Sequence, residues 1–161
     1  MIEIRRAKES DFDDIWEIFH QVVVRGDTYA YLPETTKEQA RESWMSNAVT
    51  TYVALLDGEV VGTYILRPNQ PGLGSHVANA GYMVKDGMHG RGIATVMCEH
   101  SLAEARQVGY LAMQYNAVVS TNERAKRLWE RMGFSVVGRV PQGFRHQEQG
   151  LVDILIMHRF L

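Results

Sequence analysis

The stretch DGMHGRGIATVMCEH, residues 86–100, places three glycines within six positions and then continues with helical spacing. It follows VANAGYMV (77–84), whose residues favour a strand. Gly90 and Gly92 allow the backbone to approach phosphate oxygens without an intervening Cβ, and a helix start presents unpaired N–H groups at the positive end of its dipole. The stretch therefore predicts a strand, a turn and a helix that form an anion site, unless the glycines serve only a tight connection.

Two common phosphate-binding motifs do not fit this turn. A Walker A loop ends in Gly-Lys-Ser/Thr, whereas Gly92 is followed by Ile93 and Ala94. A dinucleotide-binding fingerprint requires a third small residue where Thr95 stands. It also occurs in a first strand–helix–strand unit, whereas this turn follows several predicted strands. Neither motif explains the glycines.

The rest of the sequence alternates strand and helix patterns separated by short turns. Asp57-Gly58 between two β-rich runs is a strong hairpin signal, and Gly109 and Gly133 end the two later helices. The segment 26–35 (GDTYAYLPET) is rich in turn residues, and we interpret it as a candidate lid with two exposed tyrosines. The patterns predict strands at 2–6, 51–56, 60–67, 77–84, 111–119, 135–140 and 151–160, and helices at 12–23, 36–44, 93–108 and 122–132.

Composition and charge restrict the class of protein. A chain of 161 residues with 45% hydrophobic and 22% charged residues, without a Pro- or Ser-rich linker, is typical of one globular domain, 1–161. The net charge of -2 provides no basic field for nucleic acid or an anionic membrane. The charged amino terminus and the absence of a long apolar run predict a cytoplasmic protein. Scattered histidines and the lone Cys98 predict no metal site and no internal disulfide.

The glycine-rich turn resembles the pyrophosphate loop of the GNAT-type N-acetyltransferases, which reads Gln/Arg-x-x-Gly-x-Gly/Ala after a strand. Gly92 and Ala94 match this signature, and His89 stands where Gln or Arg is usual. Residues 122–134 resemble the second signature of the family, Asn-x-x-Ala-x-x-Leu-Tyr-x-x-x-Gly-Phe, with Trp129 in the tyrosine position. With both signatures in the right order, the chain is identified as a member of this superfamily.

The resemblance implies a mixed α/β fold, the GNAT fold: a central, mostly antiparallel twisted sheet that is splayed between its fourth and fifth strands, with helices on both faces. It implies acetyl-CoA as the cosubstrate, and a homodimer as one option. Residues 62–84 and 113–122 are similar to the fungal acetyltransferases of proline analogues such as azetidine-2-carboxylate, and 26–35 is similar to the phosphinothricin-type enzymes. Both relatives acetylate small amino acids, so the resemblance implies direct acetyl transfer from acetyl-CoA to the amine of a small molecule, an amino acid or analogue.

The resemblance also implies which residues bind the cosubstrate. The backbone N–H of Met83 or Val84 is expected to face the thioester oxygen as an oxyanion donor, and Asn122 is expected both to cap its helix and to bind pantetheine. The expected cofactor-binding residues are Met83, Val84, His89, Gly90, Arg91, Gly92, Ile93, Ala94, Thr95, Asn122, Ala125 and Trp129.

Other residues are expected to bind the acceptor. Asn79 and Asn116 resemble the amide residues that hold the substrate in the proline-analogue branch, and an unpartnered asparagine is unfavourable in a strand. Tyr29 and Tyr31 on the candidate lid complete the predicted substrate-binding set. Each asparagine can instead be a satisfied turn or bulge residue.

The predicted catalytic residues are Val84, through its backbone, His76 and Tyr115. Many relatives have a tyrosine that protonates the departing thiolate, but the indole of Trp129 cannot do so, which leaves Tyr115 or Tyr82 unless these serve only packing. No Asp or Glu stands on strand 77–84, so His76 is the candidate base. An exposed loop histidine, with water carrying the proton, is the alternative.

Two other functions stay open. Loss of both the usual tyrosine and the strand carboxylate fits a non-catalytic acyl-CoA-binding sensor. Acetylation of protein lysines or amino termini, the peptide alternative, requires an open groove in place of a lidded pocket.

Overall fold

The computed structural model describes all residues, 1–161. Its elements follow the order that the sequence predicts, strand, two helices, three strands, helix, strand, helix, two strands, with two short 3-10 helices in addition. The elements are β1 (Ile2–Arg6), η1 (Glu9–Asp11), α1 (Phe12–Val24), α2 (Lys37–Trp44), β2 (Thr50–Leu56), β3 (Glu59–Pro68), η2 (Gly72–Gly74), β4 (Val77–Val84), α3 (Ile93–Val108), β5 (Ala112–Val119), α4 (Glu123–Arg131), β6 (Ser135–His146) and β7 (Gly150–Phe160).

The seven strands form one sheet in the order β1-β2-β3-β4-β5-β7-β6. Every neighbouring pair is antiparallel except β4 and β5. This parallel pair is short, because only Val77↔Ala112 and Ala78↔Met113 are in register. Beyond these residues the two strands diverge, which confirms the predicted mixed α/β fold with a sheet splayed between its fourth and fifth strands.

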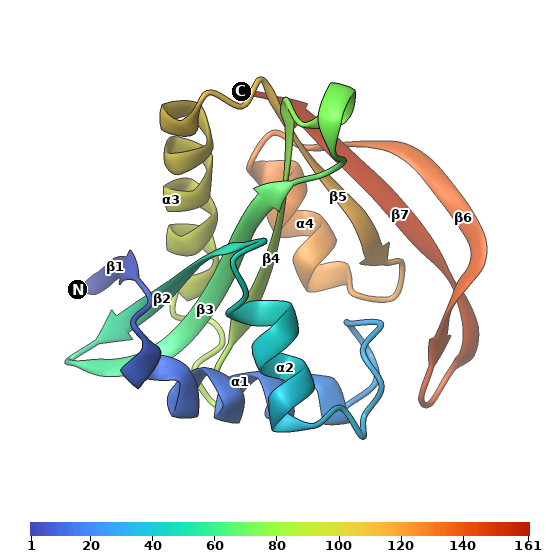
Figure 1. The fold of residues 1–161 in the computed structure, drawn as a ribbon. Helices are drawn as coiled ribbons and strands as arrows, with labels where there is room; N and C mark the ends of the chain where they lie inside the picture. Colours follow the sequence, from blue (N-terminus) through green and yellow to red (C-terminus); the bar gives the residue numbers. More distant parts are fainter.

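Helices cover both faces of the sheet and bury two separate clusters of side chains (Figure 1). α1 and α2 pack on one face, where Phe19 and Trp44 are fully buried. α3 and α4 pack on the other face, around residues such as Met97. Successive residues of a strand serve opposite faces, so Tyr64 lies in the α3–α4 cluster and Ile65 in the α1–α2 cluster.

The carboxyl-terminal hairpin is longer than the sequence predicts. β6 continues past its predicted end at Val140, because pairing with β7 resumes at Phe144 after a bulge. Pro141 lies in this bulge, which explains why the strand pattern of the sequence ends there. In Figure 1 the hairpin stands beyond α4, and at its turn the N–H of Gln147 donates to the carbonyl of Gly26, after α1, at 3.0 Å.

No helix is long and apolar enough to cross a membrane. No group of three or more His, Cys, Asp or Glu side chains is arranged to hold a metal ion.

We predict that Asp11→Asn lowers the free energy of unfolding by roughly 2 kcal/mol at pH 7. Arg5 Nη1 and Nη2 donate to the two carboxylate oxygens of Asp11 at 2.8 and 2.9 Å, and the backbone N–H of Lys8 donates to Oδ2 at 2.6 Å. The Asp11 side chain is only 9% exposed. Its replacement therefore leaves a partly buried guanidinium facing a neutral amide, and urea unfolding of both proteins measures the loss.

The same contact should make stability depend on pH. The hydrogen bond from Arg5 lowers the pKa of Asp11 below its ordinary value of 3.8. A carboxyl with a lower pKa in the folded state contributes stability above its unfolded pKa and loses it as the pH falls through its folded pKa. The difference between wild type and Asp11→Asn should therefore shrink below about pH 4. Asp14→Asn, an exposed control on α1, should change little at either pH, and an undiminished Asp11→Asn effect in acid would contradict the prediction.

Candidate active site

The candidate site lies where β4 and β5 separate. The last parallel pair is Ala78↔Met113. The next hydrogen bond between the two strands comes from a side chain, because Asn79 Nδ2 donates to the carbonyl of Gln114 at 2.9 Å. Asn79 is 8% exposed, and its Oδ1 accepts from Arg67 Nε at 3.2 Å. Both ends of the amide are thus bonded, and the residue marks the point where the gap between the strands begins.

A cavity of about 760 Å³ occupies this gap, a size usual for cofactor and small-ligand sites. Its walls come from β3, β4, β5, α4, the start of α3 and the loop after α1. The residues singled out from the sequence that line it are Met83, Val84, His89, Ala94, Asn122, Ala125, Trp129, Tyr115, Asn79, Asn116, Tyr29 and Tyr31. Those that do not line it are His76, Gly90, Arg91, Gly92, Ile93 and Thr95.

The backbone N–H of Val84, at the end of β4, is directed into the gap. Successive residues of an antiparallel strand direct their N–H and C=O groups alternately to opposite sides. The N–H of Lys85 donates to the carbonyl of Val61 on β3 at 2.9 Å, so the N–H of Met83, two residues earlier, faces β3 as well. The N–H of Val84 then faces β5, where the ladder is absent. The sequence left the N–H groups of Met83 and Val84 as candidate donors, and only that of Val84 is positioned to donate to a group in the cavity.

The glycine-rich turn adopts a backbone conformation that glycine takes most readily. Gly87, Gly90 and Gly92 each have a φ of 79°. A Cβ at Gly90 or Gly92 would meet no atom within 4 Å, so open space lies beside the backbone there. α3 has no side-chain cap, and its first turn carries unpaired N–H groups next to this space. The turn therefore has the donors and the room for an anion such as a diphosphate.

The start of α4 adds polar groups to the cavity. Asn122 Oδ1 accepts from the N–H of Ala125 at 3.3 Å, which confirms its capping role. Among the basic residues of α4, only Arg124 lines the cavity. Burial and the nearby guanidinium of Arg124 lower the pKa of His89, which favours its neutral form.

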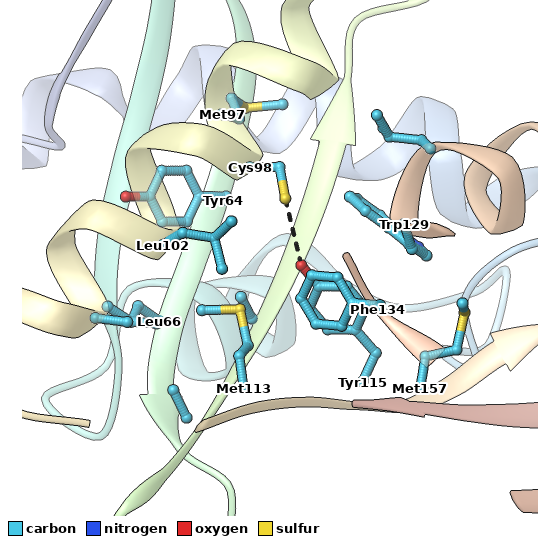
Figure 2. Close-up of a cluster of buried hydrophobic side chains, with 14 of the residues drawn as sticks. Tyr64, Leu66, Met97, Cys98, Leu102, Met113, Tyr115, Trp129, Phe134 and Met157 are labelled. Atoms are coloured by element: carbon cyan, nitrogen blue, oxygen red, sulfur yellow. Dashed lines mark hydrogen bonds between the residues drawn. The ribbon is translucent and has the colours of Figure 1, made fainter. Parts of the chain in front are cut away.

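Aromatic side chains of the α3–α4 cluster also line the cavity, among them Tyr115 and Trp129, which Figure 2 shows within the cluster. The ring centroid of Trp129 lies 4.8 Å from that of Tyr115 and 5.0 Å from that of Tyr82. Tyr115 Oη lies 2.8 Å from Tyr82 Oη and 3.7 Å from Cys98 Sγ, the contact dashed in Figure 2. Burial raises the pKa of both tyrosines well above its ordinary value, and that of the Cys98 thiol to about 11. Both hydroxyls therefore stay protonated, and Tyr115 lines the cavity, so its role as the acid stays a prediction beside the packing alternative.

The loop after α1 closes one side of the cavity. Tyr29 and Tyr31 are partly buried, so the prediction that they are exposed is wrong. Tyr29 Oη donates to the carbonyl of Tyr82 at 2.9 Å, and Gly81 makes this possible because a Cβ there would lie 3.0 Å from that hydroxyl. Trp44, fully buried, packs edge-on against Tyr29 with ring centroids 6.2 Å apart. The loop is thereby held down on the sheet, as a lid is.

The other predicted residues lie in different surroundings. Asn116 lies at a bulge of β5, where the register with β7 shifts between Tyr115 and Val118. Its exposed side chain lines the cavity, and its Nδ2 donates to Asn69 Oδ1 at 2.7 Å. His76 is exposed and precedes β4 at the end where the strand is still paired with β5. An eight-residue strand is roughly 25 Å long, so the structure does not bring His76 to the far end of the gap.

The cavity also has charged residues that sequence reasoning missed. Arg25 contacts both carboxylates of the wall: its Nη1 donates to Asp86, and its Nε lies 3.7 Å from Asp27 Oδ1. Asp27 Oδ1 is shielded from solvent and accepts no hydrogen bond. Arg67 on β3 is a further cation in the wall. Asp27 belongs to the turn-rich tyrosine segment 26–35, which was an available signal, whereas only the fold brings Arg67 to the same cavity.

Comparison with known proteins identifies the family of this fold. The model of the Acetyltransferase (GNAT) family matches residues 12–134. The chain belongs to the GNAT acetyltransferase family. This GNAT chain is also 31% identical over 118 residues to N-acetyltransferase aca1 of Schizosaccharomyces pombe. The match covers 71% of the chain and 56% of that protein, so the chain spans little more than half the length of this relative.

Solved GNAT structures share nearly the whole fold. The GCN5-related N-acetyltransferase from Kribbella flavida matches with a TM-score of 0.95 and 42% identity, over 99% of this chain and 98% of that chain. A GNAT superfamily phosphinothricin acetyltransferase from Sinorhizobium meliloti, solved in complex with AcCoA, matches with a TM-score of 0.86 over 99% of this chain and 88% of that chain. At 18% identity this second likeness shows the fold alone. The superfamily is thus confirmed, and the likeness to the proline-analogue branch stays a prediction.

GNAT acetyltransferases use acetyl-CoA, and the residues of this GNAT chain fit it. The turn before α3 has uncapped N–H groups beside open space, as a diphosphate requires. The gap between β4 and β5 leaves the N–H of Val84 facing an unpaired region, where the thioester end of the molecule would lie. Side chains such as Val118 and Leu128 give the cavity apolar walls suited to an extended pantetheine chain.

Proposed function

We propose that this GNAT protein is an acetyl-CoA-dependent N-acetyltransferase that transfers the acetyl group directly to the amine of a small molecule, an amino acid or close analogue. The observation that carries the proposal is one continuous cavity of about 760 Å³. It contains both Ala94 and Asn122, beside the glycine-rich turn and the α4 start, and Tyr29 and Tyr31 of the closed loop. A covered compartment of this size suits a small acceptor better than a protein surface.

The backbone of β4 supports the acyl transfer itself. Bound acetyl-CoA supplies an activated acyl carbon. The N–H of Val84, directed into the gap, is positioned to stabilise negative charge that develops on the acyl oxygen. Cys98, the lone thiol, is fully buried, and burial raises its pKa to about 11. A protonated, buried thiol is a poor nucleophile, which supports direct transfer to the amine instead of transfer through the protein.

Asp27 is our candidate to accept the proton of the amine. The amine must be unprotonated to attack, so a group in the cavity or water takes its proton. Asp86 accepts from Arg25, whereas Asp27 Oδ1 accepts no hydrogen bond. Asp27 replaces His76 in this role because His76 does not line the cavity.

The experiment mixes purified protein with acetyl-CoA and a panel of amines while free thiol is followed. The panel contains the standard amino acids, their carboxamides, polyamines and short peptides, and mass spectrometry identifies each product. Turnover of a small amine supports the proposal. Turnover of peptides alone would favour the protein acetyltransferase, and coenzyme A binding by calorimetry without turnover would favour the sensor.

A further inference from the structure

The cations of the cavity wall are not equivalent. Arg25 is paired with Asp27 and Asp86, and Arg124 lies on α4, beside the expected cofactor end. Arg67, on β3, forms no ion pair with any acidic residue of the protein. A guanidinium in a cavity wall without a counterion is available to an anionic ligand.

Arg67 is fixed in place at one nitrogen and free at the other two. Arg67 and Asn79 are cross-strand partners, and Arg67 Nε donates to Asn79 Oδ1 at 3.2 Å. Asn79 is itself anchored, because its Nδ2 donates to the carbonyl of Gln114 at 2.9 Å. The two Nη groups of Arg67 donate to no protein acceptor. A guanidinium held this way presents a planar fork, the geometry that binds a carboxylate through two parallel hydrogen bonds.

The lid tyrosines place this fork on the acceptor side. Tyr29 and Tyr31 line the same cavity and stack with ring centroids 5.9 Å apart. Arg67 lines the cavity with both tyrosines, and its positive charge acts against the rise in pKa that burial causes at the two hydroxyls. Along β4, Arg67 pairs with Asn79 at the beginning of the gap, whereas the glycine-rich turn follows the opposite end of the strand.

We propose that Arg67 binds the carboxylate of the acceptor, so that the enzyme acetylates amino acids in preference to uncharged or cationic amines. This inference rests on the proposed function and narrows it to one substrate class. In this arrangement the fork of Arg67 holds the acid group at the start of the gap, below Tyr29 and Tyr31. The amine of the same small molecule then points along the gap toward Val84.

The test compares each amino acid that the wild type acetylates with its carboxamide, which has the same amine and side chain but no negative charge. In the wild type we expect kcat/KM to be about 100-fold higher for the acid than for the carboxamide. Arg67→Met should lower kcat/KM for the acid by about the same factor, mainly through KM, and leave the carboxamide within about threefold. Arg67→Lys keeps the charge without the fork and should fall between. Arg145→Met, an exposed strand arginine outside the cavity, is the matched control and should change neither value.

A second readout does not depend on turnover. Calorimetry should show that Arg67→Met binds coenzyme A as the wild type does, and that it no longer binds the amino acid in the presence of saturating coenzyme A. Equal losses for acid and carboxamide, or no loss for either, would overturn the role of Arg67 and leave the proposed function intact. If the wild type turns over no small amine, the proposed function fails. In that case Arg67-dependent binding of an amino acid still supports this inference, and its absence overturns it.

Discussion

Gly92→Asp should raise the dissociation constant for coenzyme A by about two orders of magnitude. Gly92 has a φ of 79° and open space on its Cβ side, next to the uncapped start of α3. A carboxylate in that space would lie beside the diphosphate. Two unit charges at about 5 Å repel by about 3 kcal/mol at an effective dielectric constant of about 20. Titration calorimetry at low ionic strength, where screening is weakest, measures the effect.

Two matched variants isolate the charge. Gly92→Asn has the same size and the same backbone conformation without the charge, and it should weaken binding by less than about tenfold. Gly109→Asp makes the same change at the other end of α3, where φ is 106° and a Cβ again meets no atom within 4 Å. It should leave coenzyme binding unchanged. Equal losses for Gly92→Asp and Gly92→Asn would show that repulsion is not the cause, and no loss in either would place the diphosphate elsewhere.

Trp44→Ala has the largest expected effect on stability, a loss of about 4 kcal/mol in the free energy of unfolding. Trp44 is fully buried, and its Nε1 donates to Thr63 Oγ1 at 3.0 Å. Its ring packs edge-on against Phe19 and Tyr29, with centroids 5.8 and 6.2 Å apart. The substitution therefore leaves a large cavity beneath the tyrosine loop, and urea unfolding measures the cost.

The same substitution should affect the two ends of the active-site cavity differently. Without the indole the loop carrying Tyr29 loses its support, so KM for the acceptor should rise while coenzyme affinity is retained. Trp16→Ala, on α1, is the control: its ring is only partly buried, and it should cost less than half as much stability and leave KM unchanged. A parallel loss of coenzyme affinity in folded Trp44→Ala protein would contradict this division of the cavity.

Local signals in the sequence predicted the elements well. Asp57, Gly58, Gly109 and Gly133 all have positive φ, and each lies at a hairpin turn or a helix end. Such residues act within a few positions of themselves, so their effect can be predicted without the fold. That the sheet splays between its fourth and fifth strands was predicted from the family resemblance, because no residue pattern specifies where the hydrogen bonds between two strands end.

Properties that depend on distant partners could not be predicted. Tyr29 is partly buried because Gly81 leaves room for its hydroxyl, and the carbonyl that accepts its hydrogen bond is 53 positions away. Arg67 and Asp27 are ordinary charged residues in the sequence. In the fold, however, Arg67 forms no ion pair, and Asp27 Oδ1 accepts no hydrogen bond although Arg25 Nε lies 3.7 Å away. His76 was chosen because histidine titrates near neutrality. It lies outside the cavity because it precedes β4 at the end that is still paired with β5.

The short parallel pairing divides the sheet into two blocks, β1–β4 and β5–β7. Their strands share two residue pairs, and the hydrogen bonds from Leu111 N–H to the His76 carbonyl and from the Asn79 amide add to these. Every other neighbouring pair of strands shares five or more residue pairs. The molecule should open first along this seam, which native-state hydrogen exchange or mechanical unfolding would detect. Bound acetyl-CoA would contact both blocks and hold them together. Resistance to heat and proteases should therefore rise with the concentration of acetyl-CoA.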